Sequence, residues 1–298
     1  MEIRTLRYFL AVAREENMTR AAGKLHVTQP TLSKALKQLE NELGKKLFVR
    51  HSFNIELTDE GRLLRERAAD LIDMADKIHS EFSAYDDITG GNVYFGLAES
   101  YQIRHLARVI KTFLKDYPGF RYHISSGDTE QVTEKLDKGI LDFAVLVEAP
   151  DPLKYDRLKL PEEDRWGLIM PSEHPLAKKE AVTYDDLKTL PLYASEQSIK
   201  NDFPRWCGEE RVKALNFVGT FRLAYNGSVF TREGLGYLMV LEHLIGTGEE
   251  SGLVFRPLTP ELTNPLYVIW KKNAIFTPIA ERFLDAMKTY CASFEKMD

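Results

Sequence analysis

Residues 18–44 contain two helical patterns separated by a break of only three residues, at positions 26–28. Thr19 is available as the N-cap of the first, short pattern, and Thr28 as the N-cap of the second. Pro30 follows in the first turn of the second pattern, where its missing N–H costs nothing. The apolar residues of the second pattern recur at helical spacing and are Leu32, Leu36, Leu39 and Leu43. Two helical patterns so close in the chain predict a helix-turn-helix.

The opposite face of the second helix carries short polar and cationic side chains. They are Gln29, Pro30, Thr31, Ser33, Lys34, Lys37 and Asn41. This face suits the major groove of DNA, because Gln29 can pair with adenine, Ser33 with either type of base, and Lys34 with guanine or phosphate. The helix N-terminus itself attracts a phosphate. A solvated amphipathic helix is the alternative, and the tight turn before the helix favours the DNA-binding interpretation.

Positive charge is concentrated in the same stretch of the chain. Residues 18–51 hold seven Lys or Arg residues against two Glu, although the whole chain has a net charge of -5. Two short strands are predicted at 47–51 and 55–57, around a turn at 52–54, and would form a wing beside the helices. Such a basic patch suits contact with a polyanion at one end of the molecule. The candidate DNA-binding residues are Arg20, Thr28, Gln29, Pro30, Thr31, Ser33, Lys34, Lys37, Lys46 and Arg50.

A long helix is predicted after the wing, from its expected N-cap at Thr58 to residue 86. Its apolar residues alternate steps of four and three, which is typical of the seam of a coiled coil. The seam residues are Leu64, Ala68, Leu71, Ala75, Ile78, Phe82 and Tyr85. A helix of this length extends roughly 40 Å, and its seam implies a second copy of the chain and a two-fold dimer. Packing against the chain's own C-terminal half is the alternative.

Residues 87–298 change to short apolar runs that alternate with helical patterns, which is typical of α/β structure. Strands are predicted at VYFGLA, YHISS, DFAVLV, WGLIM, PLYAS, FVGTF, YLMVL and LYVIW. This arrangement predicts two α/β lobes with a cleft between them. The expected domains are a winged helix-turn-helix at 1–57, a dimerisation helix at 58–86, and a ligand-binding domain at 87–298, with lobe one at 92–162 and 265–298 and lobe two at 163–264.

The loops that follow these strands are the candidate ligand sites, because ligands of open α/β sheets bind beyond the carboxyl ends of strands and near helix N-termini. The selected loops lie at 99–102, 127–129 and 196–198. Hydroxyl groups and helix N-termini favour an anionic ligand such as a small carboxylate. Glu99 and Asp128 instead favour an amine or an amino acid. Each hydroxyl taken alone is alternatively a simple helix cap.

The first domain resembles the N-terminal signature of LysR-type transcriptional regulators, in the stretch MTRAAGKLHVTQPTLSKALKQLENELGKKLFVR followed by LTDEGRLL. The resemblance implies a periplasmic-binding-protein-like effector domain and a tetramer assembled as a pair of dimers. It also places the hydroxyls of Ser100 and Thr129 in the effector pocket, with Ser195 and residues 201–203 across the cleft. The candidate effector-binding residues are Ser100, Tyr101, Gln102, Gly127, Thr129, Ser195, Asn201 and Phe203.

We therefore expect a sequence-specific DNA-binding transcriptional regulator, whose DNA contacts are modulated by a small polar metabolite bound between the lobes. The expected partners are double-stranded DNA, an organic acid or amino acid as effector, and further copies of the chain. Contact with the transcription machinery is left open. The alternative is an enzyme that acts on a small metabolite and carries an accessory DNA-binding domain. The chain has no GxxxxGK(S/T), GxSxG or HExxH motif and no GxGxxG after a strand, which counts against that alternative.

No catalytic residue, cofactor or metal site is expected. Cys207 and Cys291 stand far apart and lack metal-ligand spacing, so reduced structural thiols are expected, with a redox switch as the alternative. The first residues lack a long apolar leader, and no apolar stretch is long enough to span a membrane. We therefore expect a cytoplasmic protein with no membrane partner.

Overall fold

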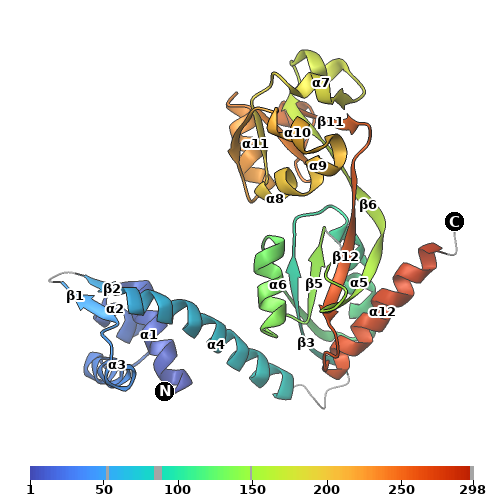
Figure 1. Cartoon of the computed structure of the whole chain (residues 1–298). Coiled ribbons are helices and arrows are strands. Elements are labelled where there is room, and N and C mark those ends of the chain that lie inside the picture. Colours follow the sequence, from blue (N-terminus) through green and yellow to red (C-terminus); the bar gives the residue numbers. More distant parts are fainter. Residues whose placement is uncertain (52–53, 84–88, 148–149, 296–298) are drawn as a thin grey trace. The chain divides into compact units, whose positions relative to one another are not determined.

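The computed structural model of the 298-residue chain describes residues 1–51, 54–83, 89–147 and 150–295. The chain divides into two compact units, residues 1–86 and residues 87–298 (Figure 1). Ser52 and Phe53 of the predicted turn and Tyr85 of the predicted seam lie outside the described residues. Among the residues described, no helix combines the length and the apolar character needed to cross a membrane.

The first unit has the elements of the predicted winged helix-turn-helix. In chain order they are α1 (Ile3–Glu15), α2 (Met18–Lys24), α3 (Gln29–Leu43), β1 (Phe48–Arg50), β2 (Ile55–Leu57) and α4 (Asp59–Ser83). The N-cap of α2 is Asn17, whose side chain accepts a hydrogen bond from the Arg20 N–H at 2.9 Å. The expected cap at Thr19 is wrong, because Asn17 begins the helix two residues earlier. Thr28 caps α3 as predicted and accepts from the Thr31 N–H.

The core of the first unit explains the two faces of α3. Leu32, Leu36 and Leu39 are buried in a cluster shared with α1 and α2, whereas Leu43 at the end of the apolar stripe is 40% exposed. Strands β1 and β2 pair antiparallel and form the predicted wing. The apolar periodicity of α3 therefore fixes which side chains of the helix are left to meet a partner.

Helix α4 starts at the wing and leaves the core of the unit part of the way along its length. The Thr58 hydroxyl accepts the Gly61 N–H at 3.0 Å, which confirms the predicted N-cap. Ala68 and Ile72 are buried in the same cluster as α3. Beyond Ile72, Ile78 and Phe82 are exposed, at 48% and 76%, whereas Met74 is half-buried.

The second unit consists of two α/β lobes. Lobe one contains β3 (Gly90–Leu97), α5 (Ile103–Asp116), β4 (Gly119–Ser126), α6 (Thr129–Asp137), β5 (Phe143–Leu146), the first half of β6 (Tyr155–Pro171), β12 (Thr263–Lys271) and α12 (Pro278–Glu295). Lobe two contains the second half of β6, β7 (Val182–Thr183), α7 (Tyr184–Leu187), β8 (Leu192–Ala194), α8 (Glu196–Lys200), α9 (Asp202–Cys207), α10 (Glu209–Lys213), β9 (Phe217–Thr220), α11 (Ala224–Arg232), β10 (Tyr237–Leu241) and β11 (Leu253–Thr259). The strand order through both lobes is β4-β3-β5-β12-β6-β10-β8-β9.

Each lobe is built around parallel strands with helices on both faces. In lobe one, β3 runs parallel to β4 and β5, and in lobe two, β8 runs parallel to β9 and β10. Phe95 and Phe143 pack with Phe283 of α12 on one face of lobe one. On the other face, Ala144 belongs to a cluster with Val132 of α6. Strands β3 and β5 are buried on both faces over most of their length, so they read in the sequence as continuous apolar runs. Strand β4 is also predicted as a buried strand, but it lies at the edge of the sheet and leaves Tyr122 and Ile124 exposed.

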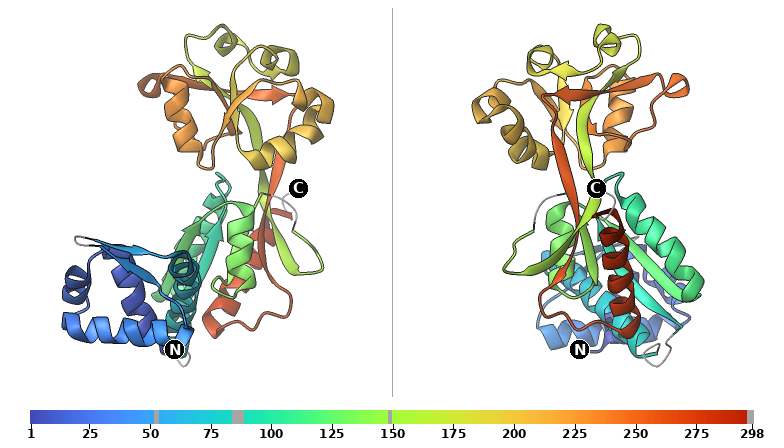
Figure 2. Two further views of the ribbon diagram at one scale, coloured as in Figure 1. Left: turned by 60° about the vertical axis from the view of Figure 1, so that its left-hand side comes forward. Right: turned by 90° about the vertical axis from the view of Figure 1, so that its right-hand side faces the viewer.

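Strands β6 and β12 connect the lobes and lie side by side in every view (Figures 1 and 2). β6 pairs with β12 from Tyr155 to Arg165, and from Trp166 onward it pairs with β10 and β11. The first half of β6 and the whole of β11 are absent from the predicted strands. The stretch YDRLKLPEEDR lacks the continuous apolar run by which the other strands are predicted, because its outward side chains are polar and exposed.

Candidate functional site

The outward face of α3 is polar along its length. The exposed residues Gln29, Pro30, Thr31, Lys34 and Lys37 lie on it, with Ser33 half-buried beside them. The hydroxyls of Thr28 and Thr31 lie 2.8 Å apart at the start of the helix. Among the described residues, no carboxylate pairs with Lys34 or Lys37. These two ammonium groups are therefore available to an external anion. The side chain of Arg50, on β1, is not among those described.

Two other predicted DNA-contacting residues are paired with carboxylates of the chain itself. Arg20 lies 3.9 Å from Glu15. Lys46 Nζ lies 3.0 Å from Glu40, which also accepts the Leu47 N–H at 2.9 Å. Burial alone would raise the pKa of Glu40, but the Leu47 N–H and the Lys46 ammonium group outweigh it and lower that pKa. The positive charge of Lys46 is therefore partly compensated before any partner binds.

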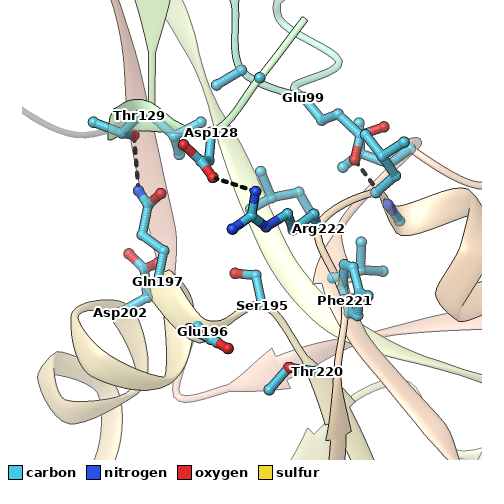
Figure 3. A pocket seen from close by; sticks show the side chains of 18 of the residues that line it. Glu99, Asp128, Thr129, Ser195, Glu196, Gln197, Asp202, Thr220, Phe221 and Arg222 are labelled. Atoms are coloured by element: carbon cyan, nitrogen blue, oxygen red, sulfur yellow. Dashed lines mark hydrogen bonds and ion pairs between the residues drawn. The ribbon is translucent and has the colours of Figure 1, made fainter. Parts of the chain in front are cut away.

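A pocket of about 820 Å³ lies between the two lobes of the second unit (Figure 3). Its walls are the loops that follow β3 and β4 in lobe one and β8, β9 and β10 in lobe two. These are the carboxyl ends of the strands, where ligands of open α/β sheets bind. Small-molecule sites have volumes of roughly 300–1,000 Å³. The pocket therefore has the place and the size of a small-molecule site.

Polar contacts join the lobes across this pocket. Gln197 Nε2 donates to the Thr129 hydroxyl at 3.1 Å, and the Arg222 guanidinium lies 3.8 Å from the Asp128 carboxylate (Figure 3). The third donor is the backbone N–H at the start of α11, which donates to the Glu99 carboxylate at 2.8 Å. The two walls are thus linked by polar groups of the chain itself.

The acidic residues of the lining lie at helix N-termini or, in the case of Glu99, contact one. They are Glu99, Asp128, Glu130, Glu196 and Asp202. Asp128 is the N-cap of α6 in a capping box, and Glu130, Glu196 and Asp202 lie in the first turns of α6, α8 and α9. Glu99 accepts the first N–H of α11. Each carboxylate therefore compensates the positive end of a helix dipole. Glu99 and Asp128, the two residues that favour an amine ligand in the sequence, therefore already have partners at helix N-termini.

The basic residues of the lining are Lys200 and Arg222. Arg222 lies between β9 and α11, next to Phe221 in the lining, and its side chain is 76% exposed. A guanidinium has five N–H donors, and among the described residues its one ion pair is the 3.8 Å contact with Asp128. Arg222 is absent from the residues predicted from the sequence, although it follows the predicted strand FVGTF. Applying the loop rule to that strand would have selected it.

Four of the predicted effector-binding residues line the pocket: Gly127, Thr129, Ser195 and Asn201. The Ser195 hydroxyl accepts the Ser198 N–H at 3.1 Å and is the N-cap of α8. Four others are not part of the lining: Ser100, Tyr101, Gln102 and Phe203. The Ser100 hydroxyl donates to the buried Asp164 carboxylate instead. Phe203 is buried in the core of lobe two against Trp166.

The two cysteines lie apart from the pocket lining. Cys291 is buried in the core of lobe one, and burial raises the pKa of the Cys207 thiol. A raised thiol pKa leaves less of the reactive thiolate at neutral pH. Among the described residues, no group of three or more His, Cys, Asp or Glu side chains is placed to hold a metal ion.

Two family models match the chain, each over one unit. The model "Bacterial regulatory helix-turn-helix protein, lysR family" matches residues 3–62, and the model "LysR substrate binding domain" matches residues 88–292. The chain belongs to the LysR family of transcriptional regulators. As a LysR-family member it is a DNA-binding transcriptional regulator, and binding of an effector by the second unit is general to the family.

Relatives and solved structures of LysR regulators match nearly the whole chain. The Hca operon transcriptional activator HcaR of Escherichia coli (strain K12) is 28% identical over 310 residues, which cover 98% of this chain and 99% of HcaR. CbnR in complex with its target DNA has a TM-score of 0.73 at 20% identity, covering 97% of this chain and 100% of CbnR. Full-length BenM has a TM-score of 0.55 at 24% identity, covering 98% and 97%. At these identities the two structures show a shared fold.

Proposed function

We propose that this LysR regulator reads its DNA site with α3 and the wing. Gln29 and Ser33 contact base edges, Lys34 contacts guanine or phosphate, and the wing contacts the DNA backbone. The outward polar face of α3, opposite its buried leucines, supports this assignment. Changing Gln29 to Ala should cost about 1–3 kcal/mol at particular base pairs and little on random DNA. Equal losses on both would remove Gln29 from base recognition.

The remaining predicted contacts position the protein on the DNA backbone. These residues are Arg20, Thr28, Pro30, Thr31, Lys37, Lys46 and Arg50. Phosphate contacts of this kind hold a recognition helix in register without reading sequence. Because Lys37 has no carboxylate partner among the described residues whereas Lys46 is bound to Glu40, Lys37 should contribute more to affinity.

The effector we propose is a small organic acid bound between the lobes, with an amino acid as the second candidate. The observation that carries this proposal is the Arg222 guanidinium, which faces the pocket and whose one ion pair among the described residues is the 3.8 Å contact with Asp128. Calorimetric screening of organic acids and amino acids against the full-length protein tests the class of ligand. Binding of amines in preference to acids would contradict it.

A second copy of the chain is the partner we propose for α4. The seam residues Leu71, Ile78 and Phe82 are 43%, 48% and 76% exposed. Large apolar side chains along one helix at heptad spacing are buried when a second helix packs against them. A two-fold dimer would match a palindromic site, and a pair of dimers is proposed as the full assembly.

We further propose that the effector acts by changing the separation of the DNA-binding units within this assembly, in the cytoplasm where the DNA lies. A ligand shifts such an equilibrium only if it binds one arrangement more tightly than the other. DNase footprinting with and without an organic acid found in the screen tests the idea. An effector that binds but leaves the footprint unchanged would contradict it.

A further inference from the structure

The two strands that connect the lobes carry buried polar side chains directly opposite each other. Asp164 on β6 and Asn264 on β12 are partners in the antiparallel pairing, and they are 2% and 1% exposed. Buried polar groups are tolerated when they are hydrogen-bonded. The hydrogen-bond partners of these two side chains therefore show which parts of each lobe are attached to β6 and β12 at this point.

Asp164 holds the loop of lobe one that follows β3. The Ser100 hydroxyl donates to its carboxylate, and the same hydroxyl accepts the Gln102 N–H at 3.0 Å. Gln102 Nε2 in turn donates to the Glu163 carbonyl at 3.3 Å. The residue before Ser100 is Glu99, which lines the pocket and contacts α11. The wall of the pocket in lobe one is therefore fastened to β6.

Asn264 holds the start of α9 in lobe two. Its Nδ2 donates to the Asp202 carboxylate at 2.7 Å. Arg205 donates to both Asn264 and Asp202, and its contact with Asp202 is 3.1 Å long. Asp202 is 4% exposed and is itself part of the pocket lining. The wall of the pocket in lobe two is therefore fastened to β12, opposite the point where β6 holds the other wall.

We propose that Asp164 and Asn264 are a positioning pair that links the two walls of the pocket at the crossing between the lobes. A displacement of either wall is passed through the pair to the other wall. For its role in regulation this inference rests on the proposed effector site, but the mechanical link exists without a ligand and is tested without one. Failure to find an effector therefore leaves the test of the link intact.

The test is hydrogen exchange, followed by mass spectrometry, on the ligand-free full-length protein. Asp164→Asn and Asn264→Leu are compared with the wild type in two segments, 98–104 and 200–207. Loss of a buried hydrogen-bonded partner should speed exchange by about tenfold or more where the backbone is loosened. A linked pair predicts faster exchange in both segments for each single variant. Faster exchange confined to the segment that the changed residue holds would overturn the proposal, and so would no change in either.

Two further variants keep the result decisive. Glu163→Gln is the matched control, since this neighbour of Asp164 directs its carboxylate to the Thr263 hydroxyl at 2.7 Å and to Lys159 at 2.8 Å. It should leave exchange in both segments as in the wild type, and equal loosening by this control would refute a role specific to the pair. Ser100→Ala removes one hydroxyl from the network and serves if Asp164→Asn fails to fold. It should also speed exchange in segment 200–207, and exchange there at the wild-type rate would overturn the link.

Discussion

The outward face of α3 in the first unit and the pocket of the second unit both present charged side chains, but they balance those charges differently. On α3, Lys34 and Lys37 point outward, and the described residues supply them with no carboxylate. In the pocket, every acidic side chain of the lining compensates a helix start, and Arg222 is turned toward Asp128. The cations on α3 are therefore open to an anion from outside the chain, whereas the charges in the pocket are already balanced by groups of the chain itself.

These two arrangements imply different ways of recognising an anion. A phosphate backbone adds to the open surface of α3 without displacing an internal contact, and its binding is driven chiefly by the release of counterions from the DNA. A ligand in the pocket must instead replace an internal contact, and exposed ion pairs of this kind are weak. We therefore expect DNA affinity to respond steeply to salt. Ligand affinity should instead depend on Asp128, the residue that competes with the ligand for Arg222.

The largest expected effect is at the seam of α4. Changing Leu71 and Ile78 together to Glu places charges where a second helix should pack, so the dimer should dissociate. Binding to a paired DNA site should then weaken by about 100-fold or more, because two linked contacts become one. Analytical ultracentrifugation and gel shifts on single and paired sites measure both. Leu63→Glu is the control, since this side chain is 57% exposed but lies off the seam. Unchanged affinity in the seam variant would contradict the coiled coil.

Next in size is the loss of Arg222 from the pocket. A hydrogen bond to a charged group contributes about 1.5–3 kcal/mol, so Arg222→Gln should weaken binding of an organic acid by at least about tenfold. Titration calorimetry with an acid found in the screen measures this loss. Lys200→Gln removes the other lining cation and should cost less. The reverse order would place the anion at Lys200.

The parts of these sites that the sequence predicted are those set by local periodicity and capping. Thr28 and the buried leucines of α3 lie within one helix, so their spacing alone identifies the two faces of the helix. The loop rule also selects Thr129 and Gln197, which line the pocket, because strand ends can be recognised in apolar runs. Ser195, which lines it as well, is implied by the family resemblance instead.

The parts that the sequence did not predict depend on contacts between distant residues. Ser100 sits in the selected loop, but its hydroxyl turns to Asp164, 64 residues later in the chain. Phe203 directly follows Asp202, a residue of the pocket lining, yet its ring is buried in the core of lobe two. No spacing rule specifies which side of a loop faces a ligand. The direction of those side chains becomes known only from the tertiary structure.

A smaller effect separates the free and the compensated lysines of the first unit. Lys34→Gln should lower the slope of log affinity against log salt by about one unit, as for one lost phosphate contact. Lys46→Gln should lower it less, because Glu40 already lies 3.0 Å from that ammonium group. Fluorescence anisotropy of labelled DNA over a series of KCl concentrations measures both slopes. Equal changes would mean that DNA displaces Glu40 completely.

The smallest expected effect is the pH dependence that comes from Glu40. Its contacts lower its pKa from the usual 4.5 in the folded protein, so they contribute stability above that value. This contribution is lost as the pH falls through the lowered pKa, because the unfolded chain then binds the proton more readily. Glu40→Gln should therefore destabilise the first unit by up to about 1 kcal/mol at neutral pH. It should also reduce the fall in the free energy of unfolding at acidic pH, which is the acid limb of the stability curve. Hydrogen exchange within residues 1–83, measured against pH, would detect this, and an unchanged acid limb would argue against it.

The double crossing of β6 and β12 also determines the order in which the chain can fold as it is synthesised. The core of lobe two lies between Trp166 and Leu262, a single continuous stretch. The core of lobe one needs residues up to Leu160 together with residues from Leu266 to Cys291. Closing that long loop costs chain entropy, and the core contacts that offset this cost are complete only after α12 has left the ribosome. Lobe one is therefore begun before lobe two and completed after it.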